Sequence, residues 1–102
     1  MERTARRDAL LALARDKSAT VAERDDAVMD LADCDDDAVL LELIELARDT
    51  DENRLITASA GSSIAEILQR RQITDLRFVE TLVPDARREI AAILGKNRAS
   101  KE

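Results

Sequence analysis

Residues 38–47 read AVLLELIELA, and this apolar stretch decides the fold class. Glu42 and Glu45 are its polar residues, and because they are three apart they share one narrow strip of a helix. A helix that is apolar over most of its circumference is usually packed by neighbours on more than one side, so we expect it in the middle of a layer of helices. A helix over about residues 38–48 should therefore organise the rest of the chain.

The composition predicts an all-α domain. Of the 102 residues, 45% are hydrophobic and 37% charged, and the chain has two Gly, one Pro and a single aromatic residue, Phe78. Such a sequence favours helices over strands. A chain of this length forms one domain without disulfides or metals. We assign residues 1–95 to this domain and residues 96–102 to a polar tail.

Caps, breakers and apolar spacing predict six helices. They span residues 4–16, 38–48, 53–71, 74–83 and 85–94, and a further helix begins near residue 18 or 20 and continues to about residue 32. The predicted cap and boundary residues are Thr4, Thr20, Thr74, Pro84 and Gly95.

Two further expectations concern packing within these helices. The inward side of the first helix is predicted to carry Ala5, Ala9, Leu10 and Leu13. Gly61 lies inside the fourth helix, where a missing side chain costs stability, and it therefore predicts either the close approach of a neighbour or a bend.

Charge is distributed unevenly along the chain, whose formal net charge is −6. Residues 20–69 carry fourteen acidic and three basic side chains, and the segments on either side are net basic. An acidic middle repels nucleic acid and anionic membranes and favours a basic partner, although solubility alone also rewards it. The sequence shows neither an apolar run of about 18 residues nor the apolar stretch of a secretory leader. We therefore expect a cytoplasmic protein that binds neither nucleic acid nor membrane.

The helix pairs echo one another along the chain. The tetrapeptide LARD occurs at residues 13–16 and again at residues 46–49, an offset of 33, and Leu31 aligns with Ile67 at an offset of 36. Self-similarity at this period is the mark of helical repeats, in which each hairpin buries its face by stacking on the next.

The middle pair resembles a HEAT repeat. Residues 40–68 read LLELIELARDTDENRLITASAGSSIAEIL, with an apolar first helix, an Asp-containing turn, then Arg, small residues and an Ile-x-x-Ile ending. Residues 82–95, LVPDARREIAAILG, are similar, and residues 9–32 match more loosely because Asp25 and Asp26 replace small residues. The resemblance spans nearly the whole chain and implies a short right-handed α-solenoid of about three antiparallel helix pairs. HEAT-like proteins are mostly protein-binding scaffolds, and small ones occur as immunity proteins of bacterial toxin systems.

The sequence lacks the residues of common catalytic and metal sites. It has no His, which removes the Ser-His and Cys-His nucleophiles and the His-Glu iron site of HEAT-like hydroxylases. Asp49, Asp51 and Asn53 match the opening of an EF-hand loop, but the Gly and Glu that the loop requires are missing. Cys34 has acidic neighbours, which disfavour the thiolate, so we expect it to be a packing residue. We expect no cofactor, no metal and no catalysis, with an enzyme as a remote alternative.

The predicted function is the binding of a basic protein by an acidic face. In a HEAT-like array the second helices of successive pairs line one face, which brings the second predicted helix beside the fourth. The predicted partner-binding residues are Asp26, Asp30, Asp33, Asp35, Asp36, Asp37, Ser59, Ser62 and Glu66. Either a monomer or an oligomer fits this sequence. The leading hypothesis is an immunity-type protein that neutralises a basic protein such as a toxin, and the alternative is a structural adaptor or complex subunit.

Overall fold

The computed structural model describes the backbone of residues 2–100 and the side chains of residues 4–95. Within this range the chain contains helices and no strands, which confirms the all-α prediction. The α-helices are α1 (Glu2–Arg15), α2 (Val21–Asp30), α3 (Asp37–Arg48), α4 (Arg54–Arg70) and α5 (Pro84–Ser100). The 3-10 helices are η1 (Leu31–Asp33) and η2 (Arg77–Thr81). Between residues 2 and 100, no helix combines the length and the apolar character that crossing a membrane requires.

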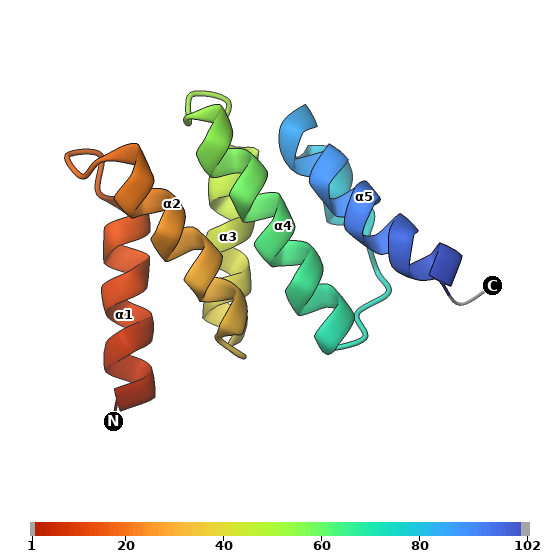
Figure 1. Cartoon of the computed structure of the whole chain (residues 1–102), viewed down its shortest axis with the longest axis horizontal. Helices are drawn as coiled ribbons and strands as arrows, with labels where there is room; N and C mark the ends of the chain where they lie inside the picture. Colours follow the sequence, from red (N-terminus) through yellow and green to blue (C-terminus); the bar gives the residue numbers. More distant parts are fainter. Residues whose placement is uncertain (1, 101–102) are drawn as a thin grey trace.

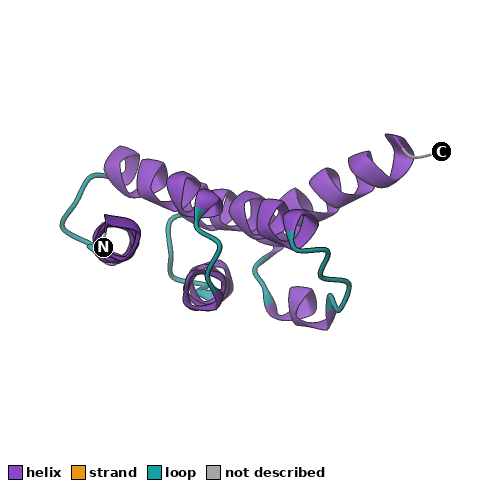
Figure 2. Cartoon of the chain, turned by 90° about the horizontal axis from the view of Figure 1, so that it is seen from below, coloured by secondary structure: helices purple, strands orange, loops and turns teal. Residues whose placement is uncertain are grey.

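The helices lie in two layers. Figure 1 shows α2, α4 and α5 side by side in front, with α3 behind them. In Figure 2, seen from below, α2, α4 and α5 follow one another along one layer, and α1, α3 and η2 form the other. Each helix of the second layer precedes one of the first in the chain, so the elements form successive pairs: α1 with α2, α3 with α4, and η2 with α5.

The most enclosed helix is α4, which packs against α2, α3 and α5. Its buried residues are Ile56, Thr57, Ala60, Gly61, Ser63, Ile64, Ala65, Ile67 and Leu68. As expected, the helix over residues 38–48 lies in the middle of a layer, between α1 and η2 (Figure 2), but the expectation that it is covered on most sides is wrong. α3 buries Val39, Leu43 and Ala47, but Leu41 is 64% exposed. The reason is that α3 packs on α4 and has only slight contact with α1, its neighbour in the same layer.

Three α-helices begin directly after a residue whose side chain accepts a hydrogen bond from a backbone N–H group of the first turn. The Thr20 hydroxyl accepts from the Glu23 backbone N–H at 3.1 Å, and the Glu23 carboxylate accepts from the Thr20 N–H at 3.0 Å, so the predicted capping box is confirmed. Asp36 and Asn53 cap α3 and α4. The predicted cap at Thr4 is wrong, because α1 begins before it.

The buried side of α1 also differs from the expected one. Ala5 and Ala9, two of the four residues predicted to face inward, are exposed, and the other two are partly buried. Leu11 and Ala14 are buried instead. α1 is the end helix of its layer and packs chiefly on α2, so one narrow stripe is covered and the remaining alanines face solvent.

An α-helix over residues 74–83 is absent, and η2 takes its place. Thr74 makes no cap; the Arg77 N–H bonds to the Asp75 carboxylate instead. The Val83 N–H donates to the Ala47 carbonyl at 2.9 Å, which joins the segment to the end of α3. Leu82 is extended at the end of η2, and Pro84 disfavours helical geometry in the residue before it, so the helical turns of η2 end before α5 begins.

The two glycines have different roles. At Gly61 a Cβ atom would lie 2.6 Å from the Ala86 carbonyl oxygen, so this glycine confirms the predicted close approach of a neighbour, which is α5. Gly95 lies inside α5 and takes no positive φ, so its predicted role as a C-terminal cap is wrong. Residues 96–100, assigned above to a tail, continue α5, and residues 101–102 lie outside the described range.

Candidate functional site

Two hydrogen bonds fix the register of α2 and α4, which run side by side (Figure 1). The Ser59 hydroxyl donates to the Asp25 carboxylate, and the buried Ser63 hydroxyl donates to the Val28 carbonyl at 2.9 Å. The outward surfaces of the two helices therefore form one continuous surface, which we call the α2/α4 face. Its residues are Val21, Asp25, Asp26, Met29, Asp30, Leu55, Ser59, Ser62 and Glu66, with Asp33 at its end in η1.

The predicted carboxylates on this face are exposed and have no cationic partner among the described side chains. Asp26, Asp30 and Asp33 are separated by four and three residues, so they follow one strip of α2 and η1. Glu66 is exposed on α4. The basic residues of α2 and α4 are Arg24, whose side chain is buried, Arg54, which pairs with Asp85, and Arg70, which is exposed four residues after Glu66 and forms no ion pair with these carboxylates. The negative charge of the face is therefore available to a partner.

The two predicted serines contact acidic groups on neighbouring helices. Ser59 donates to Asp25 of α2, and Ser62 donates to the Glu89 carboxylate of α5 at 3.0 Å. These bonds tie the outer edges of α2 and α5 to α4. Ser59 and Ser62 thus hold carboxylates in place on the surface.

The run of Asp35, Asp36 and Asp37 lies apart from these serines, at the connection from η1 to α3 and the first residue of α3, and is engaged by arginines of the same chain. Asp36 accepts from the Ala38 N–H at 2.7 Å and from Arg7. The side-chain hydrogen bond from Arg7, helped by the backbone bond from Ala38, lowers the pKa of Asp36. Arg71 pairs with Asp37 at 2.7 Å and with Asp35 at 3.6 Å. These carboxylates connect the start of α3 to α1 and to the end of α4.

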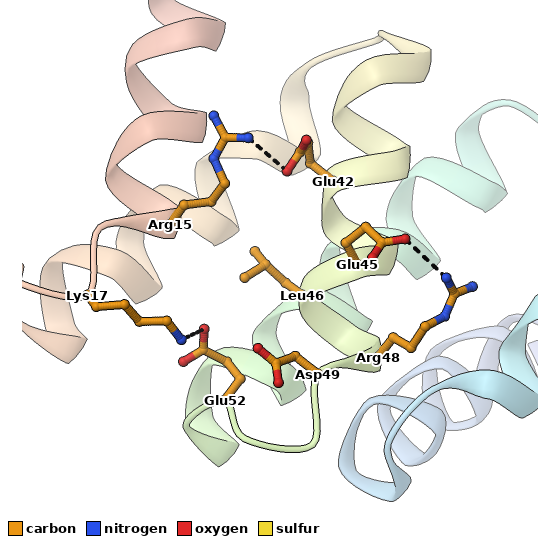
Figure 3. A pocket seen from close by; sticks show the side chains of 8 residues that line it. All are labelled: Arg15, Lys17, Glu42, Glu45, Leu46, Arg48, Asp49 and Glu52. Carbon is orange, nitrogen blue, oxygen red and sulfur yellow. Dashed lines mark hydrogen bonds and ion pairs between the residues drawn. The ribbon is translucent and has the colours of Figure 1, made fainter.

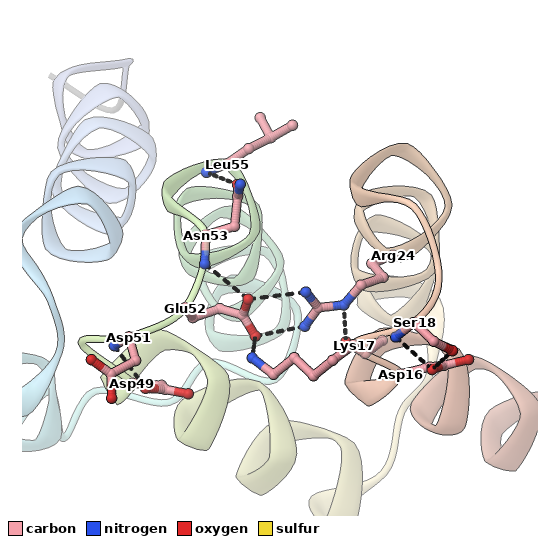
Figure 4. A network of polar contacts seen from close by, with 10 residues as sticks. Asp16, Lys17, Ser18, Arg24, Asp49, Asp51, Glu52, Asn53 and Leu55 are labelled. Atoms are coloured by element: carbon pink, nitrogen blue, oxygen red, sulfur yellow. Dashed lines mark hydrogen bonds and ion pairs between the residues drawn. The ribbon is translucent and has the colours of Figure 1, made fainter.

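A second charged group, which the sequence did not reveal, is buried between the first two helix pairs (Figure 4). The Arg24 guanidinium donates to both oxygens of Glu52, at 3.0 and 2.6 Å, and to the Ala14 carbonyl at 3.0 Å. Lys17 and the backbone N–H of Asn53 each donate to Glu52 at 2.8 Å. Burial alone would raise the pKa of Glu52, but these hydrogen bonds lower it to about 2. The carboxylate is ionised at neutral pH, so its role is to join the helix pairs and not to exchange a proton.

A hollow of about 420 Å³ lies beside this group, between α1 and α3 (Figure 3). Leu46 points into it, and its rim carries three ion pairs. These pairs are Arg15 with Glu42 at 3.1 Å, Lys17 with Glu52 at 2.8 Å and Arg48 with Glu45 at 3.0 Å. Charges that already compensate one another offer little to a charged ligand.

A larger hollow of about 630 Å³ lies at the opposite end of α1. Its lining includes both arginines and aspartates. The lining residues are Thr4, Arg6, Arg7, Asp33, Cys34, Asp35, Asp36 and Arg70. Cys34 is half-buried there and packs against the hydrophobic core, as predicted. Asp33 therefore belongs both to the end of the α2/α4 face and to this hollow, where arginines lie among the aspartates.

Comparison with protein-family models, with curated proteins and with solved structures found no match in any of the three. Among the side chains that the structure describes, no three His, Cys, Asp or Glu gather closely enough to hold a metal ion.

Proposed function

We propose that this chain is a non-catalytic protein-binding module whose α2/α4 face binds a basic protein. The observation that carries the proposal is the strip formed by Asp26, Asp30 and Asp33, with Glu66 on the neighbouring helix, exposed and without cationic partners among the described side chains. An uncompensated acidic face attracts a cationic surface, speeds its association and repels nucleic acid and anionic lipid.

We further propose that the helix pairs form a short right-handed α-solenoid of the HEAT type. The two layers of Figure 2 support this, since each element of one layer precedes one of the other. The buried bond between Ser63 and Val28 and the contact between Arg24 and Glu52 support stacking of the first pair on the second. In such an array the second helices form the binding surface, which here is the layer containing α2 and α4.

The biological role we favour is neutralisation of a basic protein, such as a toxin, by an immunity-type partner in the cytoplasm. A rigid acidic face that covers a basic surface blocks the contacts that surface makes elsewhere. A structural adaptor is the second candidate, favoured by the ion pairs that Asp35, Asp36 and Asp37 make with Arg7 and Arg71. These three carboxylates stabilise contacts within the chain and are not available to a partner.

The test is stopped-flow association with a partner recovered by affinity capture, at low and physiological salt. Replacing Asp26, Asp30 and Asp33 by Asn should slow association by about tenfold, because exposed charges steer the encounter and salt screens them. The matched control carries the same charge change elsewhere and replaces Glu45, Asp51 and Glu80 by the corresponding amides. Equal slowing of association in both variants, or an association rate that does not change with salt concentration, contradicts an α2/α4 docking face.

Co-expression distinguishes the two roles. If the chain neutralises its partner, cells that express the partner should grow only when the wild-type chain is present, and the Asp-to-Asn variant should protect them less. An adaptor leaves growth unchanged, although it still binds.

A further inference from the structure

The α2/α4 face carries uncovered apolar side chains among its carboxylates. Val21, Met29 and Leu55 are 38%, 55% and 52% exposed. Leu41, the other large apolar side chain exposed to this extent in the described residues, lies on α3 in the opposite layer. Aliphatic side chains exposed beside acidic groups provide contact area for a partner that the carboxylates attract.

The register of α2 and α4 places these side chains at two levels. Because Asp25 contacts Ser59, residues one turn earlier on each helix, Val21 and Leu55, lie at the same level near the helix starts. Met29 follows eight residues after Val21, a rise of about 12 Å along α2. Apolar contacts therefore occur at two points about 12 Å apart.

Carboxylates separate the two apolar levels and continue beyond the second. Asp25 and Asp26 lie between Val21 and Met29, and Asp30 follows directly. Along the face the order is apolar, acidic, apolar, acidic. A ligand that matches it must have two apolar groups about 12 Å apart with positive charge between and beside them.

We infer that the segment which docks on the α2/α4 face is a cationic amphipathic helix with apolar residues seven or eight positions apart. The inference rests on the proposed function, the binding of a basic protein, and specifies the element that binds. Residues seven or eight apart lie on the same side of a helix and are about 10 to 12 Å apart, which matches the two apolar levels. Lys and Arg on the flanks of that side then meet the strip of Asp26 and Asp30.

Other occupants match the face less well. An extended segment usually docks by adding to a sheet edge, and residues 2–100 contain no strand. Anionic lipid and nucleic acid are repelled by the carboxylates. A purely polar basic segment satisfies the charges but leaves Met29 and Leu55 uncovered, so it should bind with lower affinity.

The probe for this inference is a labelled synthetic peptide of about 16 residues, rich in Lys and Arg, with two leucines seven positions apart. The comparison peptide has the same composition with its leucines five positions apart, on different sides of the helix. Fluorescence anisotropy titrations against the full chain should give about tenfold tighter binding for the first peptide, because only its two leucines are buried together. Circular dichroism should show that the first peptide gains helix on binding.

Variants of the chain locate the contact. Leu55→Ser and Met29→Ser should each weaken binding of the first peptide about fivefold, and the matched control Leu41→Ser should leave it unchanged. Thermal melts of all three variants confirm that the exposed substitutions leave the fold intact.

The outcomes separate this inference from the proposed function. If both peptides bind equally, and the Asp26, Asp30 and Asp33 to Asn variant weakens both, the acidic face stands and the helical anchor is overturned. If the first peptide binds but neither Leu55→Ser nor Met29→Ser matters, the helical anchor is again overturned. Failure of both peptides to bind overturns the inference as well. Binding that ignores both the Asp-to-Asn change and the salt concentration overturns the proposed function.

Discussion

The guanidinium of Arg24 and the carboxylate of Glu52 meet in a two-point contact at 3.0 and 2.6 Å, although 28 residues separate them in the chain. Their side chains are 5% and 2% exposed. The contact joins α2 to the connection between α3 and α4, and Asn53, the next residue, caps α4. A single buried pair therefore ties the first helix pair to the second and lies next to the start of the central helix.

The first prediction is that Glu52→Gln destabilises the chain by about 3 to 5 kcal/mol. The amide removes the negative charge and leaves the Arg24 guanidinium buried without compensation. Urea unfolding followed by circular dichroism measures the loss. Glu45→Gln, which breaks an exposed pair with Arg48, is the control and should cost less than about 1 kcal/mol. Similar losses in the two variants contradict a buried ion pair.

The second prediction concerns the pH dependence of stability. The folded pKa of Glu52 is lowered from 4.5 to about 2, so its contribution is complete above about pH 4.5 and is lost as the pH falls from there towards 2. The shift corresponds to about 3 kcal/mol. Urea unfolding at several pH values across this window should show that the wild-type chain loses its advantage over Glu52→Gln. A difference that stays constant between pH 7 and pH 2 excludes this account. Because other carboxylates titrate in both proteins, the difference isolates Glu52.

Features that depend on nearby residues could be predicted from the sequence. The capping box of Thr20 and Glu23 and the close approach at Gly61 were predicted from a few neighbouring residues, and both predictions are confirmed. Which apolar helix is central depends on distant partners. The apolar stretch in α3 was more conspicuous than α4, yet α4 is flanked on three sides.

The same distinction holds for the candidate site. Helical spacing placed Asp26 and Asp30 on the outward side of α2, where the structure has them. Nothing local indicates that Asp36 meets Arg7, which lies 29 residues away, or that Glu52 meets Arg24. Such pairs are set by how the helix pairs stack, and a charged residue in the sequence looks the same whether or not it finds a partner.

The third prediction uses the two glycines as a matched pair. Gly61→Ala should destabilise the chain by about 1 to 3 kcal/mol, because the new Cβ would lie 2.6 Å from the Ala86 carbonyl oxygen and force α5 away from α4. Gly95→Ala should stabilise α5 by up to about 1 kcal/mol, because nothing lies within 4 Å of its Cβ position and Ala is the better helix former. Thermal and urea unfolding of both variants test the signs. A stabilising Gly61→Ala shows that the two helices are not in close contact.

The fourth prediction compares two leucines of α3. Leu43 is fully buried against the core, whereas Leu41 is 64% exposed two residues earlier on the same helix. Leu43→Ala should cost about 2 to 5 kcal/mol through the lost apolar burial and the cavity left behind. Leu41→Ala removes the same atoms from a solvated position and should change the free energy of unfolding by less than about 0.5 kcal/mol. Urea midpoints measured under identical conditions give both values. A large loss in both variants indicates that α3 is covered on both sides in solution, as its apolar sequence suggests, and a small loss in both indicates that α3 does not pack on α4 through Leu43.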